Sequence, residues 1–178
     1  AKSVLAGSDG RTLAVVLSDS DAVALVDMPT LRVQKTIHVG RNAAHAAFSP
    51  DGRWIYASAS ASDSDSVAVI DVANGTVVDT IGVGGAPGGI AFLPDGTRAY
   101  AAIPATREIA VIDVSRRAVV ARVHSAARLD DVAVHPDGNR VFASAAGAAK
   151  LRVLDARSNR IIADVDVGAG PSAMAFTP

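Results

Sequence analysis

The chain has 178 residues, a formal net charge of −1 at pH 7 and no cysteine, and 49% of its residues are hydrophobic. The balanced charge provides no basic field, so neither nucleic acid nor an anionic membrane is an expected partner. The lack of cysteine excludes disulfides, thiolate metal sites and cysteine nucleophiles. No apolar run approaches the length of a membrane span, and the first residues, AKSVLAGS, lack the long apolar core of a signal peptide.

A five-residue motif recurs along the chain at nearly constant spacing. Its copies are GSDG at 7–10, FSPDG at 48–52, FLPDG at 92–96 and VHPDG at 134–138, and the chain ends in a further partial copy, FTP. The motif aspartates Asp9, Asp51, Asp95 and Asp137 are 42, 44 and 42 residues apart. A period of about 40 residues indicates an array of repeated structural units. The repeats are 9–50, 51–94, 95–136 and 137–178, preceded by eight residues.

Each repeat contains the same four short segments in the same order. The first follows Asp-Gly and begins at Thr12, Trp54, Arg98 or Arg140; the second ends at Asp27, Asp71, Asp113 or Asp155. The third reads VQKTIHV, VVDTIGV, VVARVHS or IIADVDV, and the fourth reads AAHAAF, GGIAF, DDVAV or SAMAF. These runs are rich in Val, Ile and Ala and are separated by Gly, Pro, Asp, Ser and Asn, which predicts strands and turns.

The predicted fold class is therefore all-β. No window has an apolar period of 3.6 residues long enough for a helix, so a parallel sheet with crossover helices is not expected. Each repeat is expected to form one four-stranded antiparallel meander. Several strands are apolar at nearly every position, which predicts that both faces of each sheet are covered. Four-stranded sheets stacked face to face, one per repeat, are the blades of a β-propeller.

The stretch Val67 to Ala102 resembles the YVTN family of β-propeller repeats. The matching elements are the VID strand end, the Asn74-Gly75 turn, the T-I-x-V-G run at 80–84 and the P-x-G-x-A run at 87–91. The resemblance extends over all four repeats and is strongest in the second. It implies an exported bacterial protein, secreted or periplasmic, with a propeller of the WD-like or lactonase-like type that usually has seven blades.

Four repeats supply fewer blades than the family's usual ring. The chain also begins and ends in the innermost strand, since 1–8 occupies the same place in the repeat as 171–178, and one of these strands is surplus to a four-bladed ring. An open array would expose strand edges and an apolar face. We therefore expect the chain to complete a ring with copies of itself, as a homo-oligomer, or with further blades of a longer chain. A four-bladed monomer is the other possibility.

The aspartates that occur in every repeat are expected to be structural. In the Asp-Gly turns, the aspartate accepts hydrogen bonds from the backbone that follows it, and the glycine adopts the positive φ that closes the turn. The aspartates that end the second segments receive the same interpretation, because a residue needed by every blade is seldom a single active site.

A functional site is expected where one repeat departs from the others, at the start of the innermost strands. Two residues after the position of Pro87, the repeats read His45, Gly89, Asp131 and Ala173. His45 and Asp131 thus replace small residues near the expected mouth of a central channel. The candidate ligand-binding residues are Arg41, Asn42, His45, Arg128, Asp130 and Asp131. Convergent polar groups of this kind suit an anionic or sugar-like ligand, although a solvated funnel has the same appearance.

Other polar residues give weaker signals. His38, His124 and His135 have no partner histidine at metal spacing, so no metal site is predicted. The acidic loops with Asp19, Asp21, Asp63 and Asp65 lack the pattern of a calcium loop. Repeat 95–136 has six arginines, and an arginine-rich surface there could meet phosphate or carboxylate. The glycine-rich run 82–89 joins two strands rather than opening a helix, so it does not predict a dinucleotide site.

No nucleophile with an adjacent base can be assembled, and the sequence favours a non-catalytic protein without a cofactor. The expected function is a scaffold or binding module whose rim recognises a protein, a polysaccharide or a small ligand. The alternative is a propeller enzyme, lactonase-like or a cofactor-positioning oxidoreductase subunit, with its site at the channel mouth.

Overall fold

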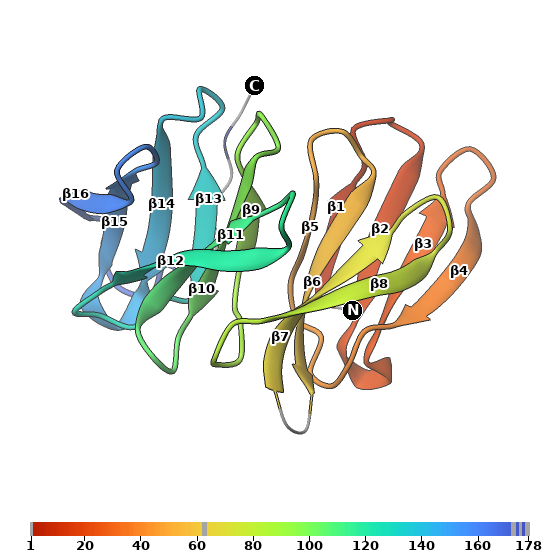
Figure 1. The fold of residues 1–178 in the computed structure, drawn as a ribbon, viewed down its shortest axis with the longest axis horizontal. Helices are drawn as coiled ribbons and strands as arrows, with labels where there is room; N and C mark the ends of the chain where they lie inside the picture. The colour runs from red at the N-terminus through yellow and green to blue at the C-terminus, as the bar shows by residue number, and fades with distance from the viewer. Residues whose placement is uncertain (1, 62–63, 172–173, 175, 177–178) are drawn as a thin grey trace. The chain divides into compact units, whose positions relative to one another are not determined.

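A computed structural model describes residues 2–61, 64–171, 174 and 176 (Figure 1). The described residues form 16 strands and two short 3-10 turns, Ser18–Ser20 and Ala146–Ala148. The strands make four antiparallel sheets of four strands each, so the all-β prediction is confirmed. The chain divides into two compact units, residues 1–86 and 87–178, each with two sheets.

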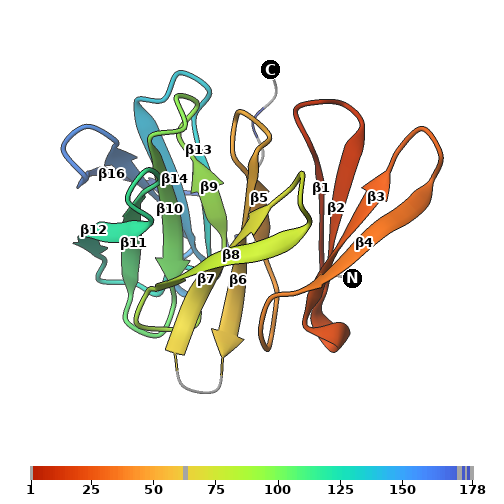
Figure 2. The ribbon, with the colours of Figure 1, turned by 45° about the vertical axis from the view of Figure 1, so that its right-hand side comes forward.

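The first unit contains two sheets in which neighbouring strands follow one another along the chain (Figure 2). Its first sheet is β1 (Ser3–Ala6), β2 (Thr12–Leu17), β3 (Ala22–Asp27) and β4 (Arg32–His38). Its second sheet is β5 (Ala46–Phe48), β6 (Trp54–Ala61), β7 (Ser64–Asp71) and β8 (Thr76–Gly82).

The second unit repeats this plan. Its first sheet is β9 (Ile90–Phe92), β10 (Arg98–Ile103), β11 (Glu108–Asp113) and β12 (Ala118–His124). Its second sheet is β13 (Asp131–Val134), β14 (Arg140–Ala145), β15 (Lys150–Asp155) and β16 (Arg160–Asp166). The register also repeats, because Thr12, Trp54, Arg98 and Arg140 each pair with the aspartate that ends the following strand. Positions in different sheets can therefore be equated residue by residue.

Three of the four sheets draw their strands from two consecutive sequence repeats, and the first sheet takes β1 from the residues that precede the first repeat. The short innermost strand β5 lies in repeat 9–50, whereas its partners β6, β7 and β8 lie in repeat 51–94. The expectation that each repeat forms a whole sheet by itself is thus wrong by one strand. The physical reason is the Asp-Gly turn: it is a tight hairpin, so the strand before it must pair with the strand after it. For the same reason β1 is the inner strand of the first sheet.

The turn aspartates have the structural role expected of them. Asp9 Oδ1 accepts hydrogen bonds of 2.9 Å from the backbone N–H groups of Arg11 and Thr12. Asp51, Asp95 and Asp137 accept equivalent bonds from the N–H two residues later. The glycine of each pair has a φ between 62° and 73°. The strand-end aspartates hold the next turn in the same manner, as in the 2.9 Å bond from Asn74 N to Asp71 Oδ1.

The core of each unit consists of small aliphatic side chains. In the first unit, the buried residues Val16, Val23, Ile55 and Ile70 belong to one hydrophobic cluster. In the second unit, a separate cluster includes the fully buried Ile109, Leu129, Val141 and Leu154. The few aromatic residues include Tyr100, whose hydroxyl donates to the Ala156 carbonyl over 3.2 Å. Burial of this phenol raises the pKa of Tyr100.

Candidate functional site

The polar residues named from the sequence lie at one end of the sheets in each unit. The Asp-Gly turns and the turns after the strand-end aspartates lie at the other end. In the first unit the candidate end comprises the turn between β2 and β3 and the connection 39–45. In the second unit it comprises the turn between β10 and β11 and the connection 125–130.

In the first unit, Arg41, Asn42 and His45 occupy the connection that leads into β5. Asn42 has a φ of 54°, and its N–H donates to Asp21 Oδ1 over 2.9 Å, which ties this connection to the turn after β2. The His45 N–H donates over 2.8 Å to the hydroxyl of Ser58, a fully buried residue of β6. The buried hydroxyl of Ser58 therefore holds the backbone at the start of β5, while the Arg41 side chain is exposed.

In the second unit, Arg128, Asp130 and Asp131 lead into β13. Arg128 Nε lies 2.8 Å from Asp130 Oδ1, and the two side chains form an ion pair at the surface. The Asp131 N–H donates over 3.1 Å to the hydroxyl of Ser144, which is fully buried in β14. Buried serines thus support the two strand starts that carry His45 and Asp131.

Glycine allows another strand to approach Asp131 closely. The Gly89 N–H donates to the Asp130 carbonyl over 3.0 Å. A Cβ on Gly89 would overlap the Asp131 carboxylate, and a Cβ on Gly88 would overlap the Asp130 carbonyl. These glycines therefore serve close packing of β9 against β13, and Asp131 fits only because position 89 has no side chain.

The six candidates thus form two groups, one in each unit. Arg41, Asn42 and His45 lie in the connection that precedes β5, and Arg128, Asp130 and Asp131 lie at the start of β13, where Arg128 and Asp130 are in contact.

The remaining histidines lie apart from these groups. His38 ends the outer strand β4 and is exposed. His124 ends β12, where its Nε2 lies 3.1 Å from the buried Glu108 carboxylate, and His135 Nδ1 lies 2.9 Å from Asp137 Oδ1. Among the described residues no group of three or more His, Asp or Glu could hold a metal ion. Asp63 of the second acidic loop lies outside the described residues.

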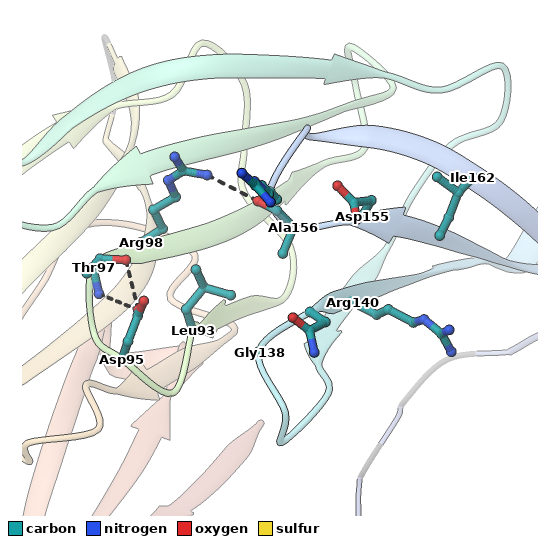
Figure 3. A pocket seen from close by; sticks show the side chains of 11 residues that line it. Leu93, Asp95, Thr97, Arg98, Gly138, Arg140, Asp155, Ala156 and Ile162 are labelled. Carbon is teal, nitrogen blue, oxygen red and sulfur yellow. Dashed lines mark hydrogen bonds between the residues drawn. The ribbon is translucent and has the colours of Figure 1, made fainter.

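A hollow lies at the Asp-Gly end of the second unit, where no site was expected. It has a volume of about 610 Å³ and is shown in Figure 3. It is bordered by the turn between β9 and β10, the turn between β13 and β14, and the turn between β15 and β16. Its charged residues are Asp95, Arg98, Arg140, Asp155 and Arg157.

The first unit has a smaller hollow in the equivalent place. Its volume is about 350 Å³, and its charged residues are Asp9, Asp51 and Arg53. The Thr12 hydroxyl donates to Asp9 over 2.7 Å and holds the pKa of that carboxyl below its ordinary value. The Ser158 hydroxyl lowers the pKa of Asp155 in the second unit in the same way. These carboxylates are ionised at neutral pH.

The hollow of the second unit was missed because its residues are dispersed in the sequence. Arg98, Arg140 and Arg157 come from three segments, and the sequence shows arginine richness only for repeat 95–136. The signal in the sequence is the presence of arginine at these three positions and its absence from the equivalent positions of the first unit.

Comparisons with solved structures identify the architecture. Hydrazine synthase from Kuenenia stuttgartiensis matches with a TM-score of 0.85 and 28% sequence identity, over 93% of this chain and 48% of that chain. The β-propeller domain of Cps50 (Swd1) from Myceliophteria thermophila matches with a TM-score of 0.84 and 17% identity, over 99% of this chain and 58% of that one. The chain therefore has the β-propeller fold, and it spans about half the length of these structures.

No family model matches the chain, and no curated protein matches it. In the described part of the chain, no helix is long and apolar enough to cross a membrane.

Proposed function

We propose that this β-propeller chain is a non-catalytic scaffold or binding module, and that each unit has its own recognition surface, at the strand start 41–45 in the first unit and at 128–131 in the second; these residues are called the rim below. The observation that carries the proposal is the support beneath His45 and Asp131. Both backbones are held by the hydroxyl of a fully buried serine, Ser58 or Ser144. A backbone that is already held in place loses little conformational entropy on binding, which favours recognition.

The chemistry of the rim suits a ligand with many hydroxyl or carboxylate groups. In the first unit Arg41, Asn42 and His45 offer donors, and in the second unit Asp130 and Asp131 offer acceptors. In the second unit Arg128 and Asp130 also form a surface ion pair. A polysaccharide with uronic acids presents both kinds of partner, so we propose this class of ligand first and a polar protein surface second.

Binding to an array of neutral and uronic-acid oligosaccharides tests the proposal. The double variants R41A/H45A and R128A/D131A are compared with R53A and R116A, which remove arginines from the opposite end of the sheets. We expect the rim variants to lose at least about tenfold in affinity, because each removes charge-assisted hydrogen bonds. Equal binding by the rim variants and the wild-type chain would refute this assignment.

A second candidate function is favoured by the 28% identity to hydrazine synthase. In this alternative the chain is the propeller part of an oxidoreductase, and His45 or Asp131 contributes to a metal or cofactor site. Metal analysis and the visible absorption spectrum of the purified protein test it. A near-stoichiometric metal or chromophore that is lost in H45A or D131A would support the alternative, whereas unchanged loading in both variants would remove its site.

We also propose that the propeller is completed with further blades, supplied by copies of the same chain or by a longer chain. The support is that the chain spans 48% and 58% of the two matching structures. Light scattering coupled to size exclusion, over a range of concentrations, distinguishes the sources. A stable species at an integer multiple of the chain mass indicates completion between copies, and a compact monomer argues against it.

A further inference from the structure

The hollow at the Asp-Gly end of the second unit has the features of a binding site for an anion. It lies at the end of the sheets opposite the proposed rim and is independent of that proposal. Its volume of about 610 Å³ is in the range of pockets that hold small organic ligands. Three arginines and two aspartates line it, so its fixed charge is positive.

The three arginines occupy positions that the fold does not require to be arginine. Arg98 and Arg140 begin the second strands of their sheets, and the equivalent residues in the first unit are Thr12 and Trp54. Arg157 follows the strand-end Asp155 by two residues, where the first unit has Ala73 after Asp71. The same turns and registers thus form without these arginines.

One arginine is held in place by the protein itself. Arg98 donates from Nη1 to the Ala156 carbonyl over 3.1 Å, as Figure 3 shows. The same carbonyl accepts the buried Tyr100 hydroxyl, which also lies 3.1 Å from Asn159 Oδ1. Arg98 is therefore fixed along one wall of the hollow.

The other two arginines keep their hydrogen-bonding capacity for a ligand. Arg140 and Arg157 are exposed, and within the described part of the chain the guanidinium group of neither makes a hydrogen bond or ion pair, although the charge of Arg157 acts on the nearby Asp155. Guanidinium groups bind phosphate and carboxylate oxygens in pairs, which makes arginine the preferred residue for these anions.

The aspartates of the hollow are occupied by their own turns. Asp95 Oδ1 accepts the Thr97 N–H over 2.9 Å and the Thr97 hydroxyl over 2.8 Å. Asp155 Oδ1 accepts the Ser158 N–H over 2.7 Å and its hydroxyl over 2.6 Å. These bonds hold both carboxylates in their turns, and the three arginines exceed the two aspartates by one positive charge.

The hollow also has an apolar part. Leu93, Ala156 and Ile162 line it, and Ile162 of β16 is 56% exposed. An organic group placed against these side chains would bury apolar surface while its anion meets the arginines.

We propose that this hollow binds a small organic molecule through a phosphate or carboxylate group, with Arg140 and Arg157 as the principal contacts. The hollow of the first unit is the internal comparison. It has one arginine against two aspartates, a smaller volume and no arginine at the three equivalent positions, so it does not bind the same ligand.

Isothermal titration of the whole chain with phenyl phosphate, benzoate and benzyl alcohol tests the proposal. The three probes share a ring and differ in charge, so the two anions distinguish phosphate from carboxylate as the recognised group. We expect at least one anion to bind and benzyl alcohol not to bind. R140A/R157A should weaken anion binding by about tenfold or more, since both charge-assisted contacts are lost.

Two matched variants complete the experiment. R53A removes the arginine of the first unit's hollow and should leave the affinity unchanged. R140K/R157K keeps the charge but loses the paired geometry and should bind with intermediate affinity. Absence of binding by both anions, equal binding by R140A/R157A and the wild-type chain, or an equal loss in R53A would each overturn the proposal. The hollow and the rim are tested separately, because the rim variants R41A/H45A and R128A/D131A change no residue that lines the hollow.

Discussion

The two units of the chain have the same arrangement of strands but different residues at the two ends of their sheets. Both contain two four-stranded sheets with the same order, the same register and a register shift at the same place between their third and fourth strands. Yet the hollow at the Asp-Gly end has one arginine in the first unit and three in the second. At the opposite end, the second unit has glycines at 88 and 89, where the first unit has Lys2 and Ser3.

Residues that recur in both units are those that the fold of each sheet requires, whereas residues that differ between the units are candidates for a binding site. Turn aspartates, positive-φ glycines and alternating core positions recur in both units. Residues that differ at equivalent positions, such as Arg157 and Ala73, are not required by the turn geometry that both units share. Departures between equivalent positions are therefore the best guide to function in a repeat protein.

The largest expected effect comes from truncating equivalent core residues, which tests whether the two units are alike in stability. Ile70 and Leu154 each precede a strand-end aspartate, and both are fully buried. Ile70→Ala and Leu154→Ala should each lower the free energy of unfolding by about 2–5 kcal/mol, because each leaves a cavity. Urea denaturation measures both. Val120→Ala, at an exposed residue of β12, is the control and should cost less than about 0.5 kcal/mol. A several-fold smaller loss in one unit would show that the cores are not equivalent.

A smaller effect on stability is expected at Gly88 and Gly89, where β9 of the second unit lies close to β13. Gly88→Ala and Gly89→Ala should each cost about 1–3 kcal/mol, because the added methyl overlaps Asp130 or Asp131. Ser3→Ala, at the position equivalent to Gly89, should change stability by less than about 0.5 kcal/mol.

A double-mutant cycle tests whether the loss of stability in Gly89→Ala comes from overlap with the Asp131 side chain. Asp131→Ala should restore part of the loss in Gly89→Ala, since the obstacle there includes a side chain. It should not rescue Gly88→Ala, where the obstacle is the Asp130 backbone carbonyl. Equal rescue of both glycine variants would contradict the close approach described for β9 and β13.

The smallest expected effect is on acid stability. The Ser49 hydroxyl donates to Asp51 Oδ1 over 2.5 Å and lowers the pKa of Asp51 below its ordinary value of about 3.9. A carboxyl with a lowered folded pKa stabilises the fold fully above its unfolded pKa and loses that stabilisation as pH falls through the folded pKa. Ser49→Ala should therefore reduce the loss of stability below about pH 4.

The equivalent position in the second unit provides the contrast. The pKa of Asp137 is lowered chiefly by the Asn139 N–H, and His135 contributes less. His135→Ala should thus alter the acid response less than Ser49→Ala. Urea midpoints recorded from neutral pH to about pH 2 measure both. An identical pH profile for Ser49→Ala and the wild-type chain would contradict the assignment for Asp51.

Local patterns in the sequence predicted most of the fold. Aspartate and glycine at a fixed period predicted the turns at Asp9 and Asp51, and runs of Val, Ile and Ala predicted the strands. The grouping of strands was missed because the repeat was divided at its own hairpin. A tight Asp-Gly turn forces its flanking strands to pair, whereas the longer connection 39–45 does not.

The site was less predictable than the fold. The departures at His45 and Asp131 were visible, but the buried serines that support them, Ser58 and Ser144, look like ordinary strand residues in the sequence. The hollow depends on segments up to 69 residues apart, from Leu93 to Ile162, and these segments belong to two different sheets, so that only the packing of one sheet against the other brings them together.

The offset between sheet and repeat affects how such a chain can change in length. Because every sheet after the first takes its inner strand from the repeat before it, backbone hydrogen bonds join each repeat to the next. Duplication of one stretch from turn to turn adds a whole sheet, since the copy receives one inner strand and donates another. Loss of such a stretch likewise leaves every remaining sheet with four strands. The tight hairpin at the repeat boundary therefore makes this architecture tolerant of recombination that adds or removes blades one at a time.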